Sequence, residues 1–132
     1  MPATKMTFDL DTAARLLSSA APFSALAPDD RLALLQSPKI VLDREETLFS
    51  AGDPAEAVYV ILSGEIVLEI DGSDGKSICV SALGPGGVFG ELAVLDGNPR
   101  SVGARATVRS VLLSVKASAF MALVRSQPGF AM

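Results

Sequence analysis

Histidine and tryptophan are absent from this sequence of 132 residues, and cysteine occurs once. Histidine-based iron and zinc sites are excluded, as is a Ser-His-Asp triad. A single cysteine, Cys79, forms neither an intramolecular disulfide nor a cluster of several thiolates. Because Cys79 lies in an apolar, strand-like run, we expect it to be a small buried core residue. No catalytic residue and no metal ligand is predicted.

Basic residues and long apolar runs are also scarce. Eleven lysines and arginines face fifteen acidic residues, which gives a net charge of −4 and a pI near 4.7. This balance disfavours direct nucleic-acid binding. No apolar run reaches the roughly 20 residues that cross a bilayer, and the first residues lack the apolar core of a signal peptide. We therefore expect a cytoplasmic protein that binds neither nucleic acid nor membrane.

The residues that are present predict one folded domain over 1–132, because 49% are hydrophobic and only 20% are charged. Helical spacing of apolar residues predicts N-terminal helices within 8–37, the second beginning at Pro28 with acidic residues in its first turn. Helical spacing returns at 117–126. Between these limits the pattern is that of short strands joined by turns.

The strand pattern predicts a mainly β fold with flanking helices. In 58–62, for example, Val58, Val60 and Leu62 face one way while Tyr59 and Ile61 face the other. Eight such strands favour an eight-stranded jelly-roll barrel over 39–116. The expected strands are 39–43, 46–50, 58–62, 65–70, 77–83, 88–89, 102–108 and 110–116.

Residues 84–101 carry the chemistry. Glycines lead into a short helix-compatible run at 91–95, and a turn with Arg100 and Ser101 follows. Arg100 supplies a planar fork of donors suited to phosphate oxygens. Glu91 would repel a phosphate unless it accepts from a donor such as a sugar hydroxyl, so the combination favours a ribose phosphate. The alternative is that Glu91 caps its own helix and pairs with Arg100 as an ordinary surface ion pair.

These motifs resemble those of the cyclic nucleotide-binding domain family. Phe-Gly-Glu-Leu-Ala at 89–93, followed by Pro-Arg-Ser at 99–101, is similar to its phosphate-binding cassette. The glycine turns within 51–54, 58–65 and 83–86 are similar to other recurrent turns of the family, in the same order. The resemblance covers about residues 22–124, and three spaced motifs are far more specific than one glycine pattern.

The resemblance implies a cyclic nucleotide as ligand and no metal. By analogy, Arg100 and nearby N–H groups hold the phosphate, Glu91 accepts from the ribose 2′-hydroxyl, and Ser101 contacts the phosphate or base. Ser101 favours cyclic AMP over cyclic GMP. Alanine is common in the family where this chain has Val102, which narrows the pocket. The predicted ligand-binding residues are Gly90, Glu91, Leu92, Arg100, Ser101 and Val102.

The expected function is regulatory and not enzymatic: a sensor that signals to an effector domain or partner protein through movement of its terminal helices. The alternative is a ligand-independent interaction or dimerisation domain with a degenerate pocket. Val102 and the lack of the family's longer C-terminal helix motivate this alternative, and a homodimer stays open. Cyclic nucleotide hydrolysis is disfavoured, because histidine is absent and the carboxylates form no separate cluster suited to metals.

Overall fold

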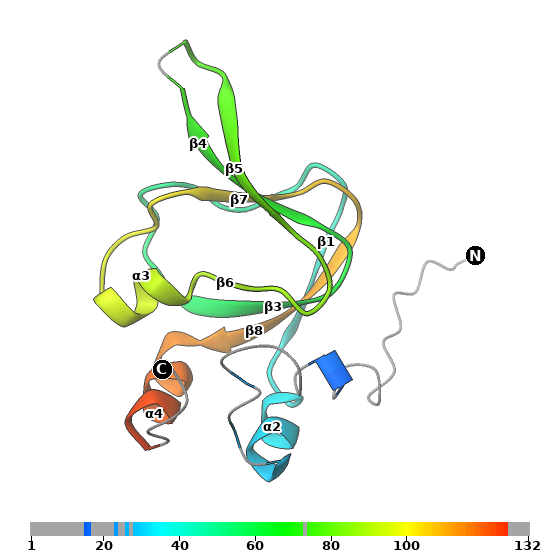
Figure 1. The fold of residues 1–132 in the computed structure, drawn as a ribbon, viewed down its shortest axis with the longest axis vertical. Coiled ribbons are helices and arrows are strands. Elements are labelled where there is room, and N and C mark those ends of the chain that lie inside the picture. The colour runs from blue at the N-terminus through cyan, green and yellow to red at the C-terminus, as the bar shows by residue number, and fades with distance from the viewer. Residues whose placement is uncertain (1–14, 17–22, 24–25, 27, 73, 127–132) are drawn as a thin grey trace, which may run out of the picture.

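A computed structural model describes residues 15–16, 23, 26, 28–72 and 74–126. Of the first predicted N-terminal helix, which precedes Pro28, only positions 15 and 16 lie within these residues, and both are helical. In chain order the elements are α2 (Pro28–Leu34), β1 (Lys39–Leu42), β2 (Thr47–Phe49), β3 (Ala57–Ser63), β4 (Ile66–Asp71), β5 (Ser77–Leu83), β6 (Val88–Phe89), α3 (Glu91–Asp96), β7 (Gly103–Ala106), β8 (Ser110–Lys116) and α4 (Ala117–Ser126) (Figure 1).

The eight strands form two antiparallel four-stranded sheets, in the orders β1-β8-β3-β6 and β2-β7-β4-β5. The predicted jelly roll of eight strands is confirmed, but the two sheets do not close into a continuous barrel. Helices α2 and α4 lie on the outer side of the sheet that contains β3 and β8, whereas the β4–β5 hairpin extends away from the sandwich (Figure 1).

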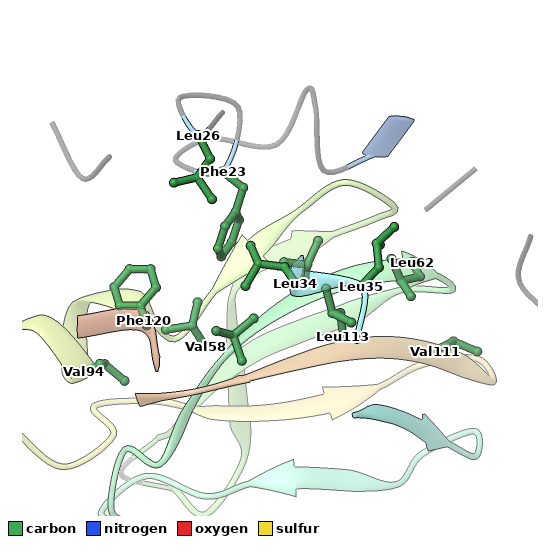
Figure 2. Close-up of a cluster of buried hydrophobic side chains, with 12 residues drawn as sticks. Phe23, Leu26, Leu34, Leu35, Val58, Leu62, Val94, Val111, Leu113 and Phe120 are labelled. Atoms are coloured by element: carbon green, nitrogen blue, oxygen red, sulfur yellow. The ribbon is translucent and has the colours of Figure 1, made fainter. Parts of the chain in front are cut away.

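Strand β3 separates two apolar clusters, because nearly all of its residues are buried. Val58, Val60 and Leu62 belong to the cluster beneath the helices (Figure 2). Tyr59 and Ile61 belong to the cluster between the sheets. The alternation predicted from the sequence is confirmed. Both faces of this strand therefore stabilise the fold, at roughly 1.5–3 kcal/mol for each fully buried large apolar side chain.

The turn after β3 depends on Gly64, which adopts a φ of 95°. A Cβ at this position would collide with Ser110. The Ser110 hydroxyl is buried and accepts a hydrogen bond of 3.1 Å from the Glu65 N–H. Glycine is needed here, because the turn requires both the left-handed backbone and the missing side chain.

The prediction that Cys79 is buried is wrong, because the structure exposes it. Cys79 lies on β5, which is the edge strand of its sheet. Its neighbours Ile78 and Val80 are exposed as well. The hairpin extends beyond the opposite sheet, so the apolar character of β5 does not bring burial.

Helix α3 packs against strand β3 and against the C-terminal helix α4. Its residue Val94 is buried in the same cluster as Phe120 of α4 and Phe23 (Figure 2). The rings of Phe23 and Phe120 meet edge to face with centroids 6.2 Å apart, which is a favourable aromatic geometry. Within the described part of the chain, no helix combines the length and apolar character needed to cross a membrane.

Candidate binding site

The six residues predicted from the sequence all line one cavity of about 370 Å³. It lies between the cassette formed by β6, α3 and the loop before β7, and the inner side of β4 and β5. Phe49, Leu68 and Phe89 contribute apolar wall. The volume falls within the roughly 300–1,000 Å³ that small-molecule pockets commonly enclose.

Arg100 forms the floor of this cavity and is 4% exposed. Its Nη1 donates to the Gly90 carbonyl at 2.8 Å, and its Nη2 donates to the Ala57 carbonyl at 2.5 Å. Its Cζ lies 4.2 Å from the centre of the Phe49 ring. The guanidinium is thus fixed by the cassette, by β3 and by β2.

The charge of Arg100 is not neutralised within the described part of the chain. The ion pairs there form at Arg105 and Arg109, and the Nε of Arg100 is buried without a hydrogen-bond partner. Burial lowers the pKa of Arg100, while Tyr59 and the more distant carboxylates of Asp53 and Glu56 raise it. Arginine stays protonated in proteins, so a buried cation that has no ion pair with another described residue faces the cavity. A bound anion would remove this electrostatic cost.

Glycine is required at position 90, because the side chain of Arg100 leaves no room there for a Cβ. Gly90 adopts a φ of 85°, and a Cβ built there would lie 2.6 Å from Nη1 of Arg100. The sequence analysis placed Gly90 among the residues that bind the ligand. In the structure the group that approaches closely is the guanidinium, so glycine at this position leaves space for the arginine.

Glu91 is half-buried at the start of α3. Burial raises the pKa of its carboxyl group above the ordinary value of 4.5, whereas the N–H groups of Glu91 and Leu92 and the charge of Arg100 lower it in part. The ion pair with Arg100 proposed as the alternative is not among those that the described residues form. Glu91 therefore remains available to accept a hydrogen bond from a group in the cavity.

The other predicted residues lie around the opening of the cavity. Leu92 is 69% exposed, Ser101 is exposed and Val102 is half-buried. Arg105, by contrast, lies outside the lining and pairs with Glu45 and Glu69. Whether the six residues bind a ligand stays a prediction.

Phe49 and Tyr59 contact Arg100, and their association with the site was missed by the sequence analysis. Both lie in apolar strands whose pattern indicates only core packing. The spacing of the aromatic residues gave no signal that their rings meet an arginine from another part of the chain. A group of three or more His, Cys, Asp or Glu side chains that would hold a metal ion is also not found among the described residues.

Comparison with known proteins identifies the family. The sequence model of the cyclic nucleotide-binding domain matches residues 39–127, which include the whole cavity lining. This chain belongs to the cyclic nucleotide-binding domain family. The cyclic AMP receptor protein of Thermus thermophilus is 33% identical over 107 residues, which are 80% of this chain and 50% of that protein.

The structure of this cyclic nucleotide-binding domain is also similar to that of the regulatory domain of Toxoplasma gondii PKA with cAMP. The TM-score is 0.79 at 27% identity, over 85% of this chain and 43% of the other. Lysophospholipase nte1 of Aspergillus terreus is 29% identical over 89% of this chain, but the match covers only 7% of that enzyme. The domain thus occurs in regulatory proteins and within a larger enzyme. The chain spans about half the length of the first curated relatives it matches.

Proposed function

We propose that this domain binds cyclic AMP in the cavity above Arg100 and acts as a cytoplasmic regulatory sensor, not as an enzyme. The observation that carries the proposal is the buried guanidinium, which lies in the cavity floor and has no ion-pair partner within the described part of the chain. A cyclic phosphate carries the negative charge that would balance this cation. Membership of the family supports the same ligand class.

Each predicted residue has a role in this proposal. Arg100 contacts the phosphate, Ser101 contacts the phosphate or the base, and Glu91 accepts a hydrogen bond from the ribose 2′-hydroxyl. Gly90 keeps Arg100 in place, while Leu92 and Val102 supply apolar contacts near the opening. Hydrogen bonds to charged groups contribute about 1.5–3 kcal/mol each, so Arg100 and Glu91 dominate the expected affinity.

The preference for cyclic AMP over cyclic GMP rests on Ser101 and on the relatives. The solved PKA regulatory domain contains cAMP, and the Thermus thermophilus relative is a cyclic AMP receptor protein. We expect the two nucleotides to compete for the same cavity, because they share the ribose and the cyclic phosphate. Their affinities then differ only through contacts to the base.

Signalling through the terminal helices is supported by two connections between the cavity and α4. Val94 of α3 and Phe120 of α4 share one buried cluster. The N–H of Ala117, the first residue of α4, donates to the Glu56 carbonyl. The next carbonyl along the chain, at Ala57, accepts from Arg100. A ligand that moves the cassette or Arg100 therefore acts directly on groups that hold α4. It shifts a population of α4 positions only to the extent that it binds one of them more tightly.

The test is calorimetric titration of the wild-type chain with cyclic AMP and with cyclic GMP, beside Arg100→Ala. We expect saturable binding that Arg100→Ala weakens by about tenfold to a hundredfold, as the loss of charge-assisted contacts predicts. Arg109→Ala is the matched control, because Arg109 is exposed and its single ion pair measures 4.0 Å. Absence of binding to the folded wild-type chain would contradict the proposal and favour a ligand-independent interaction domain.

A further inference from the structure

Three aromatic side chains from three different strands meet beneath Arg100. Phe49 of β2, Tyr59 of β3 and Phe89 of β6 have ring centroids 5.4–6.2 Å apart. Tyr59 and Phe89 are stacked. We call Phe49 and Tyr59 the arginine seat, because both rings also approach the guanidinium. Its Cζ lies 4.2 Å from the Phe49 centroid and 5.8 Å from the Tyr59 centroid.

The arginine seat restricts the orientation of the guanidinium plane, which the two carbonyl contacts alone do not fix. Hydrogen bonds to Gly90 and Ala57 hold two guanidinium nitrogens, but two bonds leave a long side chain free to rock about the line that joins them. A planar guanidinium also stacks on the face of an aromatic ring. The Phe49 ring therefore restricts the plane of the guanidinium.

Tyr59 adds a polar group to this arrangement. Burial raises the pKa of the Tyr59 hydroxyl, and the charge of Arg100 lowers it in part. The reverse effect is present too, because Tyr59 raises the pKa of Arg100. The two side chains are thus close enough for each to affect the ionisation of the other, and no ion pair of Arg100 is found among the described residues.

We propose that Phe49 and Tyr59 are positioning residues for Arg100, and that the arginine seat holds the guanidinium in the orientation in which it meets the phosphate of the ligand. This inference rests on the proposed function. Its physical basis is preorganisation: an arginine already fixed in place loses less conformational freedom on binding. Neither residue was among those predicted from the sequence to bind ligand.

The test compares Tyr59→Phe and Phe49→Leu with the wild-type chain in calorimetric titration with cyclic AMP. Tyr59→Phe keeps the ring and removes only the hydroxyl, and we expect about threefold weaker binding; Phe49→Leu removes the nearer ring, and we expect about tenfold, in line with cation–π and preorganisation effects. Ile61→Val is the matched control, because Ile61 lies in the same strand and the same buried cluster without lining the cavity. It should leave affinity unchanged.

A double-mutant cycle separates positioning from general packing. If the arginine seat acts through Arg100, then Tyr59→Phe and Phe49→Leu lose their effect on affinity when Arg100→Ala is already present. Equal effects in both backgrounds would overturn the inference while leaving the proposed function intact. Absence of cyclic AMP binding by the folded wild-type chain would overturn both.

A ligand-free measurement keeps the inference falsifiable if a variant folds poorly. Tyr59 is the only tyrosine in the sequence, so incorporation of 3-fluorotyrosine gives one ¹⁹F resonance that reports this site alone. Arg100→Ala should shift this resonance, and Arg109→Ala should not. A resonance unaffected by Arg100→Ala would contradict contact between the two side chains and would overturn the positioning role.

Discussion

Arg100 and Arg105 are five residues apart, yet their surroundings are opposite. Arg105 lies on the outer face of β7 and pairs with Glu45 at 2.6 Å and Glu69 at 2.7 Å. Arg100 is almost fully buried and contacts two carbonyls and two aromatic rings. The charge of Arg105 is balanced within the chain, whereas that of Arg100 has no ion-pair partner within the described part of the chain. The position of the unbalanced charge, more than the residue type, distinguishes the candidate binding site.

Among the substitutions that keep Arg100, the largest expected effect comes from Gly90→Ala, which forces a methyl group against the guanidinium. We expect about tenfold or greater loss of cyclic AMP affinity, because the guanidinium must move away from its contacts. Gly97→Ala is the matched control: Gly97 also adopts a positive φ, of 71°, but nothing lies within 4 Å of its added Cβ. Both variants should lose roughly 1–2 kcal/mol of stability from the left-handed backbone. Equal affinities of the two variants would contradict the account.

Glu91→Gln should weaken cyclic AMP binding by about three- to tenfold, because a neutral acceptor replaces a charged one. The same substitution should weaken binding but increase the stability of the fold. Since burial raises the folded pKa of Glu91 above 4.5, the carboxyl group stabilises the fold when protonated, and this contribution is lost as the pH rises through the folded pKa. At neutral pH the variant should therefore melt at a higher temperature than the wild-type chain.

The same pKa shift predicts the pH dependence of binding. As the pH falls, Glu91 takes up a proton before the pH reaches 4.5, because its pKa is raised above that value. The charged carboxylate that accepts from the ribose hydroxyl is then lost. Wild-type affinity should decline as a result, and the affinity of Glu91→Gln should change less. Calorimetric titrations from neutral pH down to the lowest pH at which the chain stays folded measure the difference. Parallel pH profiles for the two proteins would show that Glu91 is not the titrating group.

The smallest effect on cyclic AMP affinity is expected for Arg105→Ala, because the charge of Arg105 is already balanced by Glu45 and Glu69. This arginine is accessible to solvent, so salt screens its ion pairs. Affinity for cyclic AMP should change less than about twofold, because Arg105 does not line the cavity. A small decrease in melting temperature that shrinks as salt is added would fit this role. A tenfold loss of affinity would remove the contrast with Arg100.

Much of the fold was predictable from the sequence because its signals are local. Strands β5 and β8 have the predicted limits, 77–83 and 110–116. Gly75 and Gly84 bound the apolar run of β5, and β8 ends where the helical spacing of α4 begins. The opposite faces of Val58 and Tyr59 followed from period-two alternation. The burial of Cys79 was wrongly predicted, because burial depends on where a strand lies in its sheet.

The candidate site was predictable only in its cassette, where the relevant residues are close in sequence. The arginine seat was not, because Phe49 and Tyr59 approach Arg100 through pairing of strands that are far apart along the chain. The need for glycine at position 90 was not predictable either, because it depends on the place that the Arg100 side chain takes in the folded chain. Single-sequence patterns place residues on faces, but they do not show which faces meet.

The most direct test of the unbalanced charge is to compare binding of cyclic AMP and of adenosine, which has the same base but no phosphate. The wild-type chain and Arg105→Ala should both prefer cyclic AMP by about tenfold to a hundredfold, as charge-assisted phosphate contacts predict. In Arg100→Ala the two affinities should approach each other. If Arg100→Ala keeps the full preference for cyclic AMP, the phosphate is recognised elsewhere and the central claim is wrong.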